Sequence, residues 1–300
     1  MEINKEFKVG IVGQGFVGSA VKAGFEHVTT VLAYDKFQPS KSNSTLEEIV
    51  ENCEIIFVCI PTPMVLETGE AYTGIVEEVV KEIESIAQDL HKADVISHSP
   101  ILVVKSTIPP GTAERLDWML DVCTVAFNPE FLTEANAIND FIFQDRIVLG
   151  ASSNHNISQL VELYRYAFPN ATIFETTATN AEMIKYVANC FLSVKVSFAN
   201  EMYDLCQKIG ADYNQVVEGA KLDKRLGSSH WQVPGPDGDR GFGGHCFPKD
   251  MEALKFVAKE NGVKLDVVEG AVNTNNRIRK NRDWEKQIGR AVISSKIEKI

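Results

Sequence analysis

The sequence reads Phe7-Lys-Val-Gly-Ile-Val12 and then Gly13-Gln-Gly-Phe-Val-Gly18, an apolar run followed by glycines in a GxGxxG pattern. A helical pattern over Ser19–Phe25 comes next, and a second apolar run, Thr30–Tyr34, ends at Asp35. A GxGxxG pattern alone is a weak signal. Between two strands, with an acidic residue about 20 positions on, it becomes a dinucleotide-binding fingerprint. This stretch therefore predicts the first βαβ unit of a Rossmann-like domain.

Each glycine of the fingerprint, and the acidic residue after it, meets a specific requirement of dinucleotide binding. Gly13 permits a tight turn, Gly15 lets a pyrophosphate approach the backbone, and Gly18 lets the helix pack closely on the strand. Asp35 would accept hydrogen bonds from ribose hydroxyls and repel a 2′-phosphate, although Lys36 beside it weakens that preference. The alternative is a plain glycine turn with a surface aspartate. We predict NAD, rather than NADP, as the cofactor.

Strand and helix patterns keep alternating after the fingerprint. Further strands are predicted over Glu54–Ile60, Ile101–Thr107, Cys123–Phe127, Arg146–Leu149 and Thr172–Glu175, with helices over Thr45–Asn52, Ile75–Leu90 and Ala113–Leu120. This alternation is typical of a doubly wound parallel sheet, in which ligands bind at the carboxyl ends of the strands. Pro61–Pro63, Ser106-Thr107 and Asn128-Pro-Glu130 follow predicted strand ends. We therefore expect them at the same rim as the glycine loop.

The pattern changes after residue 178. Thr179-Asn-Ala-Glu182 has the form of a capping box, and neither glycine nor proline occurs from Ala181 to Ile209. A helix of about 29 residues would be about 43 Å long, which suits a helix that joins two domains or two subunits. Lys185 and Asn189 are four residues apart and share one face; the alternative is that both are solvated. We predict a Rossmann-like domain over residues 1–178 and an all-helical domain over 179–300.

The remaining helical patterns surround a glycine-rich loop over Gly227–Gly244. Shorter helices are predicted over Tyr213–Ala220 and Asp250–Asn261. A long helical pattern runs from Asp266 to Lys296, broken or bent near Gly289.

That loop leads into Arg240-Gly-Phe-Gly-Gly-His-Cys-Phe-Pro-Lys-Asp250. Cys246 precedes a predicted helix N-terminus and is followed by Lys249, and both features lower the pKa of a thiol. The alternative is a small buried residue in a turn. Cys246 is therefore a candidate nucleophile. The six cysteines show no CxxC pairs, so neither a metal site nor a disulfide framework is predicted.

Composition narrows the classes of partner. The net charge is −11 and the pI about 5.1, which argues against nucleic acid or an anionic membrane as a partner. No secretory signal pattern and no apolar run of membrane-spanning length occurs in the sequence. We expect a cytoplasmic protein with neither a nucleic-acid nor a membrane partner.

Taken together, these segments resemble the UDP-glucose/GDP-mannose dehydrogenase family of nucleotide-sugar 6-dehydrogenases. The matching segments are the glycine loop with Asp35, Ile60–Pro63, Lys105–Pro109, Asn128–Ala135, Lys185–Asn189 with Asn200-Glu201, and Gly241–Asp250. Their order and spacing fit to about Arg277. The glycine loop and helix alone would match many β-hydroxyacid dehydrogenases, but those lack the cysteine.

The resemblance implies an NAD-dependent, four-electron oxidation of a sugar C6 alcohol to a carboxylate, with UDP-glucose as the expected substrate. Cys246 would add to the aldehyde and form a thioester in the second oxidation. Lys185 would act as base for the hydroxyl proton together with Asp250 and a water, and Asn189 would donate to the same oxygen. Glu130 would activate the hydrolytic water that Thr107 helps to hold.

Binding roles follow from the same resemblance. The cofactor-binding residues would be Gly13, Gly15, Phe16, Val17, Gly18, Asp35, Thr62, Pro63, Thr107, Glu134 and Lys249. The substrate-binding residues would be Phe131, Leu132, Lys185, Asn189, Arg225, Gly243 and Gly244, with the two glycines letting the backbone approach the sugar. Arg225 matches an arginine that crosses the dimer interface in relatives. We expect a homodimer through the helix over Ala181–Ile209.

One departure from the family leaves alternatives open. Family members continue into a further nucleotide-binding α/β domain, which we expect this chain to lack. The alternatives are an NAD-binding remnant or partner-dependent module without turnover of its own, and a two-electron β-hydroxyacid dehydrogenase. His245 and the loop over Gln232–Asp239 also differ from the residues that are usual in the family. The identity of the substrate is therefore the expectation that the sequence determines least.

Overall fold

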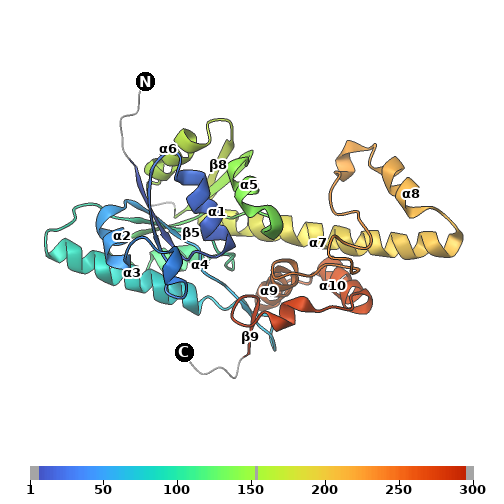
Figure 1. Ribbon diagram of the computed structural model, residues 1–300. Helices are drawn as coiled ribbons and strands as arrows, with labels where there is room; N and C mark the ends of the chain where they lie inside the picture. The colour runs from blue at the N-terminus through green and yellow to red at the C-terminus, as the bar shows by residue number, and fades with distance from the viewer. Residues whose placement is uncertain (1–6, 153–154, 295–300) are drawn as a thin grey trace. The chain divides into compact units, whose positions relative to one another are not determined.

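The structure, a computed structural model, describes residues 7–152 and 155–294. The chain forms two compact units. One comprises the chain up to Thr62 together with Thr73–Lys185, and the other comprises Pro63–Tyr72 with the chain from Tyr186 onward. The boundary therefore falls inside helix α7 (Ala178–Ile209), drawn in yellow in Figure 1.

The first unit is built on a seven-stranded sheet among the described residues. Its strands are β1 (Lys8–Val12), β2 (Thr30–Tyr34), β3 (Ile55–Val58), β5 (Ile101–Val104), β6 (Thr124–Phe127), β7 (Arg146–Ala151) and β8 (Thr172–Thr177). The spatial order is β2-β1-β3-β5-β6-β7-β8, and all neighbours are parallel except β6 and β7. The predicted Rossmann-like, doubly wound fold is confirmed, with one antiparallel pair that the strand patterns did not reveal.

Two sets of helices cover the two faces of this sheet (Figure 1). One set is α1 (Phe16–Phe25), α5 (Ala137–Ile142) and α6 (Ser158–Ala167); the other is α2 (Leu46–Asn52), α3 (Gly74–Lys92) and α4 (Thr112–Asp117). Short 3-10 turns lie at η1 (Pro39–Lys41) and η2 (Glu134–Asn136). Because successive strand side chains point to opposite faces, Phe57 lies in one apolar cluster, and Ile56 and Val58 lie in the other.

Close backbone contacts fix the turn between β1 and α1. Gly13 has a φ of +93°, and a Cβ atom there would lie 2.4 Å from the carbonyl oxygen of Cys59. A Cβ atom on Gly18 would lie 1.9 Å from the carbonyl oxygen of Gly13. Both positions therefore require glycine. Since β1 lies between β2 and β3, where the strand order reverses, the turn sits at the edge at which such sheets bind ligands.

Helix α7 confirms the long helix that the sequence predicts, but the capping box predicted at its N-terminus is not present. It spans 32 residues and already includes Thr179 in its first turn. Glu182 is fully buried and accepts hydrogen bonds from the backbone N–H groups of Gly111 at 2.5 Å and Ala113 at 2.8 Å. Burial raises the pKa of Glu182 to about 8, against the lowering effect of these donors. The predicted capping box is wrong, because Glu182 satisfies the unpaired N–H groups that start α4 instead.

The second unit is mostly helical. Besides the end of α7 it contains α8 (Tyr213–Ala220), η3 (Lys224–Leu226), α9 (Phe247–Glu260), α10 (Asp266–Ile278) and η4 (Asp283–Lys286). Tyr186, Phe242 and Met251 lie in its main core. A short parallel pair, β4 (Met64–Val65) with β9 (Val292–Ile293), is an exception to the expected all-helical character.

The predicted long helix over Asp266–Lys296 is wrong beyond Ile278, and the residues after 294 lie outside the described range. Arg279 has an extended backbone, with φ −79° and ψ 130°. Its buried side chain pairs with Asp237 and Asp283. The ion pairs of Arg279 with Asp237 and Asp283 have thus overridden the local helical preference, because helix propensity determines secondary structure only weakly.

Alkaline pH should weaken the first unit through its buried thiols. Cys53 is fully buried, and burial raises the pKa of its thiol to about 12. A thiol in an unfolded chain titrates near pH 8.5, so between about pH 9 and 12 only the folded state keeps this proton. Stability therefore falls as the pH rises through this window. We expect Cys53→Ala to reduce the slope of unfolding free energy against pH by up to about 1.4 kcal/mol per pH unit.

Urea unfolding between about pH 8 and 11 measures this slope. The control is Val50→Ala, which removes apolar volume from the same cluster without removing a titratable group. Its loss of stability should be the same at every pH. If Cys53→Ala keeps the wild-type slope, the Cys53 thiol does not retain its proton in the folded state.

Candidate active site

Asp35 ties the loop after β2 to the glycine loop. Its carboxylate accepts hydrogen bonds from the backbone N–H groups of Gln14 at 2.6 Å, Phe37 at 2.9 Å and Gln38 at 2.8 Å. The carboxylate is buried in the folded chain. The predicted fingerprint therefore does bring its glycines and its acidic residue together.

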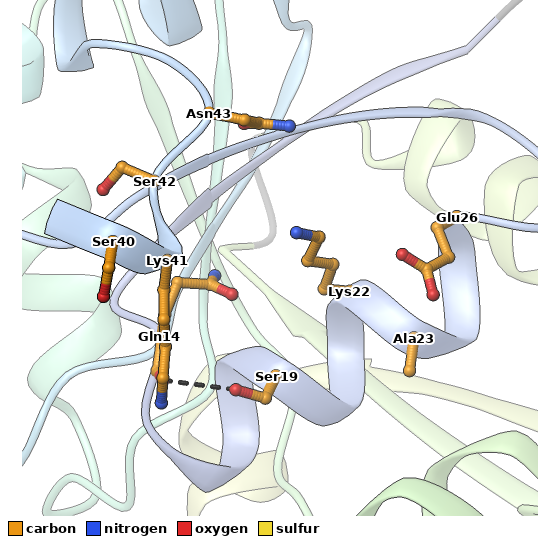
Figure 2. A pocket seen from close by; sticks show the side chains of 9 residues that line it. All are labelled: Gln14, Ser19, Lys22, Ala23, Glu26, Ser40, Lys41, Ser42 and Asn43. Atoms are coloured by element: carbon orange, nitrogen blue, oxygen red, sulfur yellow. Dashed lines mark hydrogen bonds between the residues drawn. The ribbon is translucent and has the colours of Figure 1, made fainter. Parts of the chain in front are cut away.

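A surface pocket lies beside the same loop (Figure 2). In Figure 2 the side chain of Lys22 extends from α1 into the space between the helix and the segment 40–43. Two donors converge on the carbonyl oxygen of Gln14: the ammonium of Lys41 at 3.0 Å and the hydroxyl of Ser19 at 3.2 Å. Gln14 is thereby fixed at both its N–H and its carbonyl.

These residues fit a dinucleotide. Apart from Gly15 itself and its two chain neighbours, nothing lies within 4 Å of the position of a Cβ on Gly15, so the backbone there can be approached closely. Helix α1 begins at the next residue, Phe16, followed by Val17, and the N-terminus of a helix attracts phosphate. The Asp35 carboxylate at the end of β2 would meet a ribose.

The rim beyond the strands is held together by hydroxyl groups. Thr62 donates to the carbonyl oxygen of Thr107 at 2.7 Å, and Ser106 donates to the carbonyl oxygen of Ile60. The segments after β3 and β5 are thus adjacent, as their positions past the strand ends predict. Pro63 is the next residue after Thr62 and leads into β4.

Lys185 and Glu130 form a buried ion pair. The Lys185 ammonium donates to the Glu130 carboxylate at 2.8 Å and to the Glu130 carbonyl oxygen at 2.5 Å. Burial by itself raises the pKa of Glu130, but Lys185, the N–H of Leu132 and Lys105 together hold it below the usual value. Glu130 is therefore ionised at neutral pH. Phe131 lies beside this pair, with the Lys185 ammonium 5.6 Å from its ring centre.

A second buried cation supports the loop that carries Glu130. The Lys105 ammonium donates to the side-chain oxygen of Asn128 at 2.7 Å, and Tyr164 donates to the same oxygen. Burial lowers the pKa of Lys105 to about 8, opposed by Cys59 and Glu130. Lys105 and Asn128 stand in segments that resemble the family, but the sequence alone does not assign a role to either residue. The distant Tyr164 left no signal in the pattern.

Asp250 is the centre of the corresponding group in the second unit. Its carboxylate accepts hydrogen bonds from Asn189 and from Lys249, each at 2.6 Å, and it is completely buried. Its carbonyl oxygen contacts the Cys190 thiol at 3.7 Å, and burial raises the pKa of that thiol. The three predicted residues 189, 249 and 250 are thus brought together.

Cys246 occupies the N-cap position of α9, as predicted. Its carbonyl oxygen accepts the first helical hydrogen bond, from the N–H of Asp250 at 2.9 Å. The residue is partly exposed, whereas the other five cysteines are buried. A nucleophile at this position would gain from the positive end of the helix dipole.

The remaining predicted residues are placed differently. Gly244 has a φ of +71° and faces open space, whereas Gly243 faces the guanidinium of Arg279. Arg225 is highly exposed and pairs with Asp223. Glu134 is exposed at the start of η2.

Over residues 7–152 and 155–294, no helix is long and apolar enough to cross a membrane. Over the same ranges, no cluster of histidine, cysteine and acidic side chains could hold a metal ion.

Comparison with known proteins identifies relatives of both units. Residues 28–168 match the NAD binding domain, and residues 179–277 the central domain, of the UDP-glucose/GDP-mannose dehydrogenase family. The first range begins after the glycine loop.

The chain is 36% identical over 255 residues to a UDP-glucose 6-dehydrogenase of Rickettsia bellii; the alignment covers 83% of this chain and 55% of that protein. It is 34% identical to UDP-glucose 6-dehydrogenase TuaD of Bacillus subtilis, and that alignment covers 75% of this chain and 47% of the TuaD protein.

A solved UDP-glucose dehydrogenase from Pyrobaculum islandicum superposes with a TM-score of 0.80 at 27% identity, covering 92% of this chain and 69% of that one. The chain thus spans about half the length of the curated relatives it matches. Both matched domains belong to one family and follow each other in the order that the motifs predict. The chain belongs to the UDP-glucose/GDP-mannose dehydrogenase family, and its cofactor is NAD.

Proposed function

We propose that the protein oxidises the C6 alcohol of a nucleotide sugar to the uronate, with UDP-glucose as the substrate and UDP-glucuronate as the product. The observation that carries the proposal is the position of Cys246 at the start of α9, four residues before a buried Asp250, in a chain with an NAD-binding domain. NAD⁺ bound at the glycine loop supplies the hydride acceptor for both oxidation steps. The relatives named above are UDP-glucose dehydrogenases, which supports this choice of substrate.

In the first step the C6 hydroxyl loses its proton while the C6 hydride leaves. A water molecule takes that proton and passes it to the Asp250 carboxylate, and the Lys185 ammonium beside the oxygen stabilises the developing negative charge. Asn189 lies one turn along α7 from Lys185 and donates to the same oxygen.

In the second step the Cys246 thiolate forms a C–S bond to the aldehyde carbon. The resulting thiohemiacetal loses a hydride and becomes a thioester. Glu130, ionised at neutral pH, then takes a proton from a water held by Thr107, and that water cleaves the C–S bond. The balance is one alcohol, two NAD⁺ and one water giving one carboxylate, two NADH and three protons.

The stoichiometry of NADH tests this proposal. Wild-type protein with UDP-glucose should give two NADH for each sugar consumed, because the thioester allows a second hydride transfer. Cys246→Ser should stop after the first oxidation or lose turnover, because serine is far less nucleophilic than a thiolate. Absorbance of NADH together with chromatography of the sugar product measures both, with GDP-mannose in parallel.

The matched control is Cys206→Ser, a cysteine in a separate apolar cluster of the second unit. It should keep the wild-type stoichiometry. One NADH per sugar, unchanged in Cys246→Ser, would identify a two-electron dehydrogenase. Tight NAD binding without NADH from either sugar would identify an NAD-binding module that has no turnover of its own.

We also propose that the protein acts as a homodimer through α7. Val187, Phe191, Phe198, Leu205 and Ile209 are exposed on this helix. Their spacings of four and seven residues place them on one side, as in helices that pair. A second copy of the same helix is the occupant that such a stripe fits, since a two-fold interface uses the same patch twice.

Charge placed in this stripe should separate the subunits. Phe191→Glu combined with Phe198→Glu would bury two carboxylates without partners in a dimer. We expect a monomer by sedimentation, where the wild type sediments as a dimer. The control Gln207→Glu lies on the opposite side of the same helix and should remain dimeric. A wild type that sediments as a monomer at micromolar concentration would contradict the proposal.

A further inference from the structure

The loop that precedes Cys246 is held by a buried arginine from a later part of the chain. The Arg279 side chain is 1% exposed and pairs with Asp237 at 2.6 Å and Asp283 at 3.0 Å. Its Nε atom also donates to the carbonyl oxygen of Asn281 at 2.8 Å. One guanidinium thus joins the turn at 237 to the segment 281–283.

The two glycines before His245 and Cys246 contact this arrangement directly. A Cβ atom on Gly243 would lie 2.1 Å from Nη2 of Arg279 and 2.6 Å from Oδ1 of Asp283. The backbone N–H of Gly244 donates to Oδ2 of Asp283 at 3.0 Å. Gly243 therefore leaves room for the guanidinium, and the backbone of Gly244 is anchored by its partner carboxylate.

Other anchors hold the upstream half of the loop. The side chain of Asn275 accepts from the N–H of Phe242 at 2.8 Å and donates to the Phe242 carbonyl at 3.0 Å. Arg240 bonds Asn200 on α7 at 3.1 Å and pairs with Asp204 at 2.9 Å. The segment nearest to the cysteine, residues 243–244, depends on Arg279 and Asp283.

An arginine suits this position better than a lysine would. Its planar group presents several N–H donors in a fixed geometry, so it can bind two carboxylates and a carbonyl at once. Burial lowers the pKa of the Arg279 guanidinium, but Asp237 and Asp283 raise it above the usual value. The group stays charged, and both carboxylates stay compensated.

We propose that Arg279 is a positioning residue for Cys246, acting through Asp283 to fix the backbone of Gly243 and Gly244. Arg279 and Asp283 both lie beyond residue 277, where the match to the family's central domain ends. The effect on turnover rests on the proposed function, whereas the effect on the loop does not. Preorganisation matters because a small displacement of a nucleophile lowers the rate of its reaction strongly.

Hydrogen exchange tests the effect on the loop without any substrate. In Arg279→Ala, the peptide covering residues 241–247 should exchange at least about tenfold faster, because Asp283 loses the group that orients it. Guanidinium ion at millimolar concentration should restore protection by filling the site, whereas the same concentration of urea should not. Arg279→Lys should restore little, because an ammonium cannot span the three partners.

The matched control is Arg282→Met in the same segment. Arg282 pairs with Glu285 at 3.1 Å, donates to Asn276 at 3.5 Å and lies over the ring of Trp284, and none of these partners belongs to residues 241–247. In Arg282→Met, the rate of hydrogen exchange in residues 241–247 should equal that of the wild type. Should Arg279→Ala unfold, Asp283→Asn provides the second test, with a smaller increase in exchange. Wild-type exchange in both variants would overturn the proposal.

Turnover gives the second readout. In Arg279→Ala, kcat with UDP-glucose should fall about tenfold or more while the KM for NAD stays unchanged, and guanidinium should restore kcat. Wild-type kcat in a variant with a mobile loop would overturn the positioning role. If the wild type makes no NADH from any nucleotide sugar, the proposed function fails, and hydrogen exchange still decides whether Arg279 fixes the loop.

Discussion

One face of helix α7 carries three buried polar side chains, and each needs a partner that replaces lost hydration. Glu182, Lys185 and Asn189 are three and four residues apart, which places them on the same side. Glu182 binds backbone N–H groups at the start of α4, Lys185 binds Glu130, and Asn189 binds Asp250. An unpaired charge at this depth costs several kcal/mol. The folding of the surrounding loops is therefore constrained by the polar residues of this helix.

Stability alone does not account for these groups. A buried ion pair often contributes no more than an apolar pair of the same size. Replacing Lys185 and Glu130 together by apolar residues would thus cost the fold little. The nearby Lys105 is also buried, and because no carboxylate is bonded directly to it, burial lowers its pKa to about 8. Three ionisable groups so close together are better explained by chemistry at that position, where perturbed pKa values are useful.

Much of the fold could be predicted because its signals are local. The apolar run of β3 and the absence of helix breakers in α7 are sequence properties, and the structure confirms both elements. The end of α10 could not be predicted, since the helix stops where Arg279 turns inward to acidic partners from a distant loop. The antiparallel β7 likewise depends on pairing that a single strand does not specify.

The candidate site divides in the same way. Cys246, Asp250 and Asn189 could be singled out because they stand in a motif or at helical spacing. Arg279 could not, because its role depends on which glycine it faces. In sequence, Gly243 and Gly244 look equivalent, yet a side chain at Gly243 would collide with a guanidinium, and one at Gly244 would meet open space. A glycine-rich motif therefore combines two physical requirements, close packing at Gly243 and a left-handed backbone at Gly244, and only the structure separates them.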